Sequence, residues 1–322
     1  MKQKEILLFG ATGQIGRNLI RKLSKSNFKI TAVTRNIHTA GIKLKTQANP
    51  GYLQLIELKN FDFNKVDALV KNCSICINLV GILYEKKKNH FQLIHTDLPD
   101  MLSTLAKKYK IEKFIHLSAL GIEKATDSNY ALSKLNGEKK IFHNFKNSVI
   151  LRPSIVYSVD DKFSTNFMTF LSRLPIMPLY YNGDTKFRPI HVIDLVDIIC
   201  EMIYKKENYS LLECIGPDVL SFKDILNILL EAIDKKRLLI PLPLPLARIS
   251  AKILQLLPRP ILTEDQLRLL KYDNIDSGLY KTNFDVGLKS SRRFKTEINK
   301  YSYNWKSGGQ FSNQNRRVKL ND

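Results

Sequence analysis

The chain has 322 residues, of which 44% are hydrophobic, so it is long enough to bury a full core and a smaller second lobe. Its formal net charge is +21, but no RNP, zinc-finger or helix-turn-helix pattern accompanies that charge, and we expect no nucleic-acid partner. The charge fits an anionic membrane surface or an acidic protein partner, and part of it reflects a general enrichment in lysine. No stretch reaches the ~18 uninterrupted apolar residues of a transmembrane helix.

The N-terminal segment has the pattern of a buried strand, a glycine turn and the start of a helix. The apolar run from Ile6 to Phe9 leads directly into the turn, and apolar residues continue after it at helical spacing to Leu23. Such a turn lets backbone N–H groups approach a dinucleotide pyrophosphate, and the helix N-terminus adds partial positive charge. The alternative is a strand–turn–helix that binds no ligand. The predicted cofactor contacts in this turn are Gly10, Thr12, Gly13, Gln14, Ile15 and Gly16.

The residue after the second expected strand bears on which dinucleotide is bound. This strand, Ile30 to Thr34, is followed directly by Arg35. Enzymes that prefer NAD place an acidic side chain here to accept the ribose 2′-hydroxyl, whereas a guanidinium can pair with the 2′-phosphate of NADPH. We therefore expect NADP(H) to be preferred over NAD(H). The alternative is that Arg35 is one more exposed basic residue in a lysine-rich chain.

Strands and helices alternate through the rest of the first half, as expected for a doubly wound parallel sheet. The expected elements are strands at 52–58, 75–81 and 114–117, and helices at 64–70 and 97–109. Asp62 precedes the helix at 64–70, and we predict that it caps this helix rather than binding adenine. Cys73 and Cys76 form a CxxC pattern that enters a buried strand. This position favours structural cysteines, and we expect no metal site.

Two strand ends add predicted cofactor contacts. The strand at 75–81 ends in glycine, where a cofactor sugar can pass close to the backbone, so Asn78, Val80 and Gly81 are candidates. Pro153 ends a later strand and is predicted to shape the nicotinamide pocket. Both strand ends are expected at the carboxyl edge of the sheet, where open α/β sheets bind their ligands.

Three further residues form a candidate catalytic set. Tyr130 and Lys134 are four residues apart on an expected helix and so share a face, and Ser118 ends the strand at 114–117. This arrangement resembles the Ser–Tyr–Lys set of short-chain dehydrogenases, in which tyrosine transfers a proton, lysine lowers the tyrosine pKa and binds the nicotinamide ribose, and serine polarises the carbonyl. All three are also predicted cofactor contacts. The set is either an intact triad or a relic that only holds the cofactor.

A series of motifs spanning about residues 4 to 277 carries a broader resemblance. These are Asn78 to Leu83, Ser118 to Gly121, Arg152 to Tyr157, Arg188 to Leu195, and Ile261 to Leu270 followed by Asp273-Asn274. Together they resemble bacterial relatives of the NADPH-binding accessory subunit of respiratory complex I, the alpha subcomplex subunit nine type. The Thr-x-Asp-Gln stretch distinguishes this group from sugar epimerases. The resemblance implies a Rossmann domain holding NADPH, a small C-terminal α/β lobe, and partners among complex I subunits or quinone-pathway proteins.

The chain departs from this family near the expected substrate cleft. Tyr157-Ser158 stands where members have Phe-Gly, and Ile190-His191-Val192 stands where many have Val-Tyr-Val. We interpret His191, a lone histidine in an apolar run, as a packing residue. Two functional classes stay open. The chain is either an accessory or assembly protein of complex I or quinone metabolism, or an active NADPH-dependent reductase or epimerase-like enzyme acting on a quinone precursor or another small carbonyl or alcohol.

These segments also predict how the chain divides into domains. We expect residues 1–155 to form the Rossmann domain, joined again by about 185–215, and residues 156–288 to form most of the second lobe. The stretch 246–257 is expected to be an amphipathic helix that lies on a bilayer or partner, or packs into the lobe. Residues 289–322 carry nine Lys/Arg against two acids, 9 − 2 = +7, and are expected to be disordered. We expect no leader peptide and a cytoplasmic protein, or one held peripherally on the inner face of a bacterial membrane.

Overall fold

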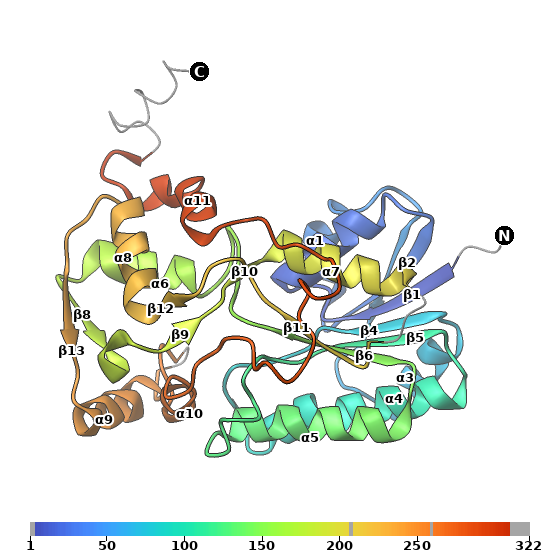
Figure 1. Ribbon diagram of the computed structural model, residues 1–322. Coiled ribbons are helices and arrows are strands. Elements are labelled where there is room, and N and C mark those ends of the chain that lie inside the picture. The colour runs from blue at the N-terminus through green and yellow to red at the C-terminus, as the bar shows by residue number, and fades with distance from the viewer. Residues whose placement is uncertain (1–3, 206–208, 258–259, 310–322) are drawn as a thin grey trace. The chain divides into compact units, whose positions relative to one another are not determined.

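The computed structural model describes residues 4–205, 209–257 and 260–309, which fall into two compact units (Figure 1). The first unit comprises Met1–Pro153, Val192–Cys214 and Asp276–Lys289, and the second comprises Ser154–His191, Ile215–Ile275 and Ser290–Asp322. Each unit has its own hydrophobic core. None of the helices within these described ranges is long and apolar enough to cross a membrane.

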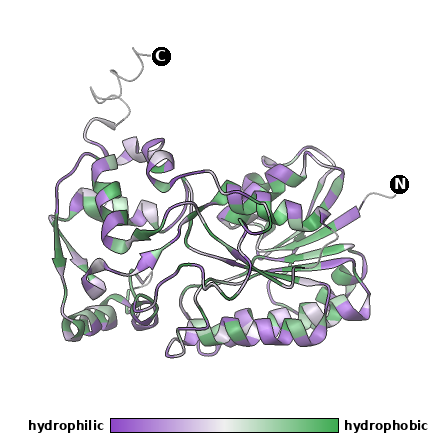
Figure 2. Ribbon diagram, in the orientation of Figure 1, coloured by the Kyte–Doolittle hydropathy of each residue, from purple (hydrophilic) through white to green (hydrophobic). Residues whose placement is uncertain are grey.

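The first unit is built on a seven-stranded parallel sheet, as the sequence predicted. Its strands are β1 (Lys4–Phe9), β2 (Phe28–Thr34), β3 (Leu53–Glu57), β4 (Ile75–Asn78), β5 (Lys113–Leu117), β6 (Ser148–Pro153) and β11 (Leu211–Cys214). They lie in the order β11-β6-β5-β4-β1-β2-β3. Apart from the edge strand β3, the strands are mostly buried, and the sheet is rich in Ile, Leu, Val and Phe (Figure 2), which is typical of a parallel sheet covered by helices.

Helices cover both faces of this sheet. They are α1 (Gln14–Leu23), α2 (Ile37–Lys45), α3 (Phe63–Lys71), the π-helix η1 (Gln92–Asp97), α4 (Leu98–Lys108), α5 (Asn129–Asn144) and α7 (Val192–Tyr204). Helices α3, α4 and α5 pack side by side on one face, and α1 packs against α7 on the other (Figure 1). The amphipathic spacing seen after the glycine turn is that of α1, which buries Leu19, Ile20 and Leu23.

The strand order reverses between β1 and β4, and the loops that follow these strands touch. The Leu79 N–H donates to the carbonyl of Phe9 over 3.0 Å, immediately beyond the two strand ends. A reversal of this kind opens a crevice at the carboxyl edge of the sheet, which is the usual ligand position in doubly wound folds. Most residues predicted to contact a cofactor end or directly follow β1, β2, β4, β5 or β6 at this edge, and Tyr130 and Lys134 lie on α5.

Four local expectations can be compared with the structure. Asp62 caps α3 as predicted, because its side chain accepts a hydrogen bond from the Lys65 N–H. The strand expected to reach Gly81 ends at Asn78, because the Asn78 side chain takes the Val80 N–H and turns the chain out of the sheet. The helix expected from residue 97 is preceded by one turn of π-helix, η1, which the sequence pattern did not predict. Cys73 and Cys76 are free and buried in the core, consistent with structural cysteines.

The second unit is a small α/β lobe. Its elements are β7 (Val156–Tyr157), α6 (Ser164–Arg173), β8 (Ile176–Leu179), the 3-10 helix η2 (Tyr180–Gly183), β9 (Lys186–Phe187), β10 (Ile190–His191), β12 (Leu220–Ser221), α8 (Phe222–Ala232), β13 (Leu238–Pro241), α9 (Leu244–Leu254), α10 (Glu264–Leu269), α11 (Phe294–Asn299) and the 3-10 helix η3 (Ser302–Trp305). Its strands pair only two by two. The core lies between α6, α8 and α11, and the half-buried His191 ring packs edge-on against the core residue Tyr157.

The expectation that the chain is disordered from residue 289 onward is wrong for residues 290–309. Residues 290–309 are folded rather than disordered, because Phe294, Ile298, Tyr301 and Trp305 recur at helical spacing and enter the core of the second unit. The high charge of this segment concealed that pattern. Residues 310–322 lie outside the described part. Segment Asp276–Lys289 belongs to the first unit rather than the second lobe, because Ser277 and Thr282 pair with Glu213 of β11.

Candidate functional site

The glycine turn after β1 leaves no room for side chains at two of its three glycines. Gly10 has φ +81°, and a Cβ there would lie 2.8 Å from the Leu79 carbonyl carbon. A Cβ at Gly16 would lie 2.5 Å from the Gly10 carbonyl oxygen. At Gly13 the nearest such contact is 3.4 Å, which is ordinary. Gly10 and Gly16 thus let backbone pack on backbone, and the turn between them presents exposed Thr12 and Gly13 to solvent.

The first turn of α1 has the features of a helix end that could bind an anion. Gly13 is its N-cap and has no side chain that could accept from the first-turn N–H groups, and the first turn carries no acid. Arg17, which the sequence reasoning missed, donates from its guanidinium to the Thr12 carbonyl and adds a full positive charge beside the turn. Backbone N–H groups, the helix dipole and this cation together favour a pyrophosphate.

Arg35 stands free at the end of β2. It is exposed and makes no hydrogen bond or ion pair within the described part of the chain. The next residue, Asn36, caps α2 by accepting from the Thr39 N–H. This guanidinium is therefore available to a ligand phosphate at the same edge of the sheet as the glycine turn.

The buried side chain of Asn78 positions the segment that follows β4. Asn78 is fully buried, its amide nitrogen lies 3.2 Å from His116 Nδ1, and its amide oxygen accepts from the Val80 N–H over 3.1 Å. Both ends of the side chain are thus used inside the protein, and Asn78 positions Val80. Direct cofactor contact by Asn78, Val80 and Pro153, which ends β6 beneath the same edge, stays a prediction.

Ser118 directly follows β5, and Tyr130 and Lys134 lie on α5; their cofactor and catalytic roles stay predictions. Lys134 donates from Nζ to the carbonyl of Leu117 over 2.9 Å, which ties α5 to the end of β5 directly before Ser118. Tyr130 lies one turn earlier on α5. A Cβ at Gly81 would lie 3.6 Å from Lys134 Nζ, so the segment after β4 also passes this ammonium.

Two polar groups of this set are buried: the Ser118 hydroxyl, which has no partner in the described part of the chain, and the Lys134 ammonium, whose pKa is lowered. Ser118 is buried, and its Oγ has no hydrogen-bond partner within the described residues. Burial lowers the pKa of the Lys134 ammonium from 10.5 to about 8, with Glu138 opposing that shift. Natural proteins rarely leave buried polar atoms unpaired. A ligand hydroxyl or amide at this point would satisfy Ser118, and a ribose or phosphate would interact favourably with Lys134.

A buried ion pair stiffens α5 one turn beyond Lys134. Arg152 of β6 donates from Nε and Nη2 to the two carboxylate oxygens of Glu138, over 2.9 and 2.6 Å, and from Nη1 to Glu123 over 3.1 Å. Its guanidinium also lies 5.0 Å from the centre of the Tyr280 ring. Bidentate pairing of this kind fixes orientation, so α5 is held against β6 one turn beyond Lys134.

Taken together, these features define the class of binding site. A glycine turn closed by backbone contacts, an uncapped helix N-terminus, a buried lysine four residues after a tyrosine, and a serine-ended strand form a Rossmann-type nicotinamide dinucleotide site of the short-chain dehydrogenase kind. The chain belongs to the NAD dependent epimerase/dehydratase family, whose sequence pattern matches residues 6–211. The matched range contains every residue predicted to bind the cofactor or to act in catalysis, from Gly10 to Pro153.

Curated relatives extend the likeness through most of the chain. The mitochondrial NADH dehydrogenase [ubiquinone] 1 alpha subcomplex subunit 9 of Arabidopsis thaliana is 26% identical over 283 residues, which covers 84% of this chain and 70% of that protein. The mitochondrial NADH-ubiquinone oxidoreductase 40 kDa subunit of Neurospora crassa is 24% identical over 285 residues, covering 88% and 74%.

Solved structures agree on the fold. The UDP-glucuronic acid 4-epimerase from Bacillus cereus, in complex with UDP-glucuronic acid and NAD, superposes with a TM-score of 0.70 at 18% identity, over 92% of this chain and 98% of that one. At this level of identity the likeness establishes architecture alone.

Proposed function

We propose that this chain is an NADP(H)-holding accessory or assembly protein linked to respiratory complex I or to quinone metabolism. The observation that carries the proposal is that relatives named as complex I subunits align over 84% and 88% of the chain, far beyond the glycine turn that unrelated dehydrogenases also possess. The intact turn at Gly10 and Gly16 supports bound nucleotide as part of the role. Lys134 and Tyr130 would hold the nicotinamide half, and the α1 N-terminus would hold the pyrophosphate.

Native purification tests this role. The untagged chain is isolated from membranes of its own cell, its co-purifying proteins are identified, and nucleotide is extracted and quantified. We expect subunits of NADH:ubiquinone oxidoreductase or quinone-pathway enzymes, together with NADP(H). A matched preparation of Gly16→Val, whose side chain would collide with the Gly10 carbonyl, should lose the nucleotide. A chain that carries no nucleotide and none of these proteins would refute the role.

We also propose that NADP(H) is preferred over NAD(H), because Arg35 stands where an acid would otherwise accept the ribose hydroxyls. Arg35→Asp should weaken NADPH binding about tenfold to a hundredfold, as loss of a charge-assisted pair and gain of repulsion require, while NADH binding changes little. Arg248→Asp is the matched control, since it makes the same charge change on α9 in the second unit. Equal wild-type affinities for the two nucleotides would refute the preference.

A second candidate function is supported by the retained triad. When bound, NADPH would supply a hydride to a carbonyl. Tyr130 would transfer the proton, the Lys134 ammonium would stabilise negative charge on the tyrosine oxygen, and the unpartnered Ser118 Oγ would donate to the carbonyl oxygen. If the chain turns over, Tyr130→Phe should abolish most reduction while nucleotide binding stays near wild type. Full activity of that variant would assign the proton to another group.

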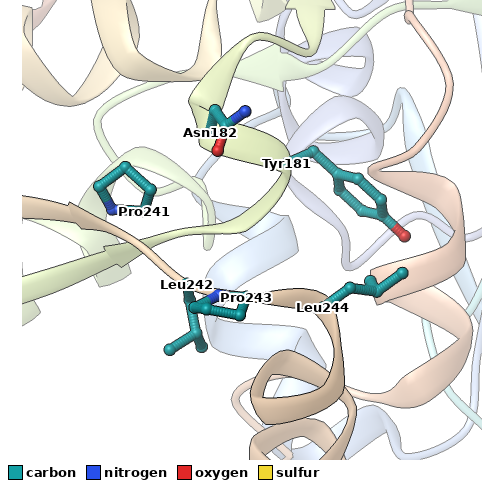
Figure 3. A pocket seen from close by; sticks show the side chains of 6 residues that line it. All are labelled: Tyr181, Asn182, Pro241, Leu242, Pro243 and Leu244. Atoms are coloured by element: carbon teal, nitrogen blue, oxygen red, sulfur yellow. The ribbon is translucent and has the colours of Figure 1, made fainter.

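A peripheral membrane contact is proposed for α9. This helix packs through Ala247 and Ala251, whereas Leu246, Ile249 and Ile253 are 53%, 54% and 62% exposed. Exposed Arg248 and Lys252 flank this row of aliphatic side chains, a pattern suited to a helix lying on an anionic bilayer. A cavity of about 260 Å³ opens where α9 begins, between Tyr181 and the segment Pro241 to Leu244 (Figure 3). The sequence left two interpretations of this stretch open: a helix that lies on a bilayer or partner, and a helix that packs into the lobe. The buried alanines and the exposed large aliphatic residues of α9 support the first interpretation.

A further inference from the structure

His95 lies in the first unit, on the single π-helical turn η1 that precedes α4. It is fully buried, and its carbonyl faces Gly137 of α5 so closely that a Cβ at Gly137 would lie 1.9 Å from the oxygen. The π-turn therefore packs backbone to backbone on α5, within the stretch of that helix that carries Tyr130 and Lys134. Single π-turns inside helices are frequent at functional sites.

The imidazole joins two segments of the nucleotide site through a continuous chain of hydrogen bonds. The Ile82 N–H donates to Nε2 over 3.1 Å, Nδ1 lies 2.9 Å from Ser133 Oγ, and Ser133 Oγ donates to the Tyr130 carbonyl over 2.8 Å. A backbone N–H can only donate and a backbone carbonyl can only accept, so the polarity is set from both ends. His95 must be neutral, with its proton on Nδ1.

Ring packing adds a second link to Tyr130. The His95 ring stacks on Phe91 with centroids 5.3 Å apart and an interplanar angle of 20°, and the Tyr130 ring meets its edge at 5.3 Å and 87°. Phe91 also meets Tyr130 directly, at 5.9 Å. These geometries are favourable for aromatic pairs. The same imidazole thus restrains both the backbone and the ring of Tyr130.

Proton transfer is not the role of this histidine. Burial, together with the nearby Lys134 ammonium, lowers the pKa of His95 to about 2, so the ring stays neutral at physiological pH. Protonation would turn Nε2 into a donor and break its bond with the Ile82 N–H. The chemistry of His95 is therefore that of a fixed donor and acceptor pair.

We propose that His95 is a positioning residue that sets the spacing between the Gly81–Ile82 segment and the Tyr130–Lys134 face of α5, and so shapes the part of the site that takes the nicotinamide ribose. Gly81 itself lies between the two, since a Cβ there would be 3.6 Å from Lys134 Nζ and 3.9 Å from His95 Nε2. The proposal rests on the nucleotide-holding function proposed above. In this arrangement His95 shapes the nicotinamide half of the site, whereas the glycine turn and Arg35 serve the adenosine half.

The binding of two ligands distinguishes the nicotinamide half of the site from the adenosine half. NADPH occupies both, whereas adenosine 2′,5′-bisphosphate lacks the nicotinamide ribose. His95→Phe keeps an aromatic ring and removes both hydrogen bonds. We expect it to weaken NADPH binding on the order of tenfold, as expected for losing two buried hydrogen bonds, and to change adenosine 2′,5′-bisphosphate binding less than about twofold. The fluorescence emission maximum of bound NADPH should also shift, because it reports the surroundings of the nicotinamide ring.

If His95→Phe folds poorly, two conservative variants still test the positioning role of His95. His95→Gln supplies an oxygen that can accept from Ile82, and His95→Asn supplies a nitrogen that can donate to Ser133, so each should recover part of the NADPH affinity. His143→Phe, an exposed histidine on α5, is the matched control and should bind both ligands as wild type does. Equal weakening of both ligands, or unchanged NADPH binding and emission, would overturn the positioning role. A wild-type chain that binds neither ligand would instead refute the nucleotide-holding function.

Discussion

Helix α5 in the first unit and helix α9 in the second bury opposite kinds of side chain. Along α5, Lys134 and Glu138 are buried, and each is matched to a partner on the sheet. Along α9, two alanines are buried and the large aliphatic residues are exposed. Charged groups are buried only at considerable free-energy cost, and apolar groups are exposed against the hydrophobic effect.

The difference teaches where ligands and partners are to be sought. The polar cluster on α5 is stable only because hydrogen bonds and ion pairs satisfy most of its atoms, which holds its geometry rigid for a small molecule. The exposed row on α9 lacks any cover within the described residues of its own unit, which suits a large apolar surface such as a membrane. The following predictions test each side of this comparison, beginning with the largest effect.

The largest effect is expected from breaking the buried ion pair between Arg152 and Glu138 of α5. Arg152→Met leaves the Glu138 carboxylate buried without its bidentate partner and should reduce the free energy of unfolding by about 3–5 kcal/mol. Lys4→Met, which breaks an exposed ion pair with Glu112, is the control and should change it by less than about 1 kcal/mol. Urea denaturation followed by circular dichroism measures both. Equal effects would show that burial of the Arg152 pair does not matter.

A smaller effect is expected from Lys134 and depends on pH. The pKa of Lys134 is about 8 in the folded chain and 10.5 in the unfolded one, so the unfolded chain binds more protons between these values. Stability should therefore rise with pH across this window, by on the order of 3 kcal/mol in full. Lys134→Met should lack this rise and be more stable than wild type near pH 7.5. Parallel stability curves for the two proteins from pH 7.5 to 10 would contradict the perturbed lysine.

The smallest effect is expected at α9. Replacing Ile249 and Ile253 together by Glu should lower binding to anionic liposomes about tenfold, because apolar area is lost and negative charge is added, and binding of wild type should fall as salt is raised. Ile42→Glu places the same change on an exposed isoleucine of the first unit and should leave binding unchanged. Co-sedimentation with neutral and anionic vesicles measures this. If the wild-type chain binds neutral and anionic vesicles equally well, an electrostatic contact with the membrane is excluded.

Much of the nucleotide site was predictable from the sequence, because its signals are local. The glycine turn needs glycines at fixed spacing, Arg35 follows a clear strand, and Tyr130 and Lys134 share a helix face by their four-residue separation. His95 was not predictable, since its π-turn exists through backbone packing against Gly137, a contact 42 residues away in the sequence. Phe294 and Ile298 were overlooked for a different reason: their charged neighbours outweighed a short helical period that only the core of the second unit makes visible.

The central claim is that the first unit of this chain holds NADP(H), and a calorimetric titration of the nucleotide-free wild-type chain tests it most directly. NADPH and NADH are titrated separately at physiological salt. We predict one site per chain and an affinity for NADPH at least about tenfold higher than for NADH, because the 2′-phosphate meets Arg35. Absence of binding by either nucleotide at millimolar concentration would contradict the claim.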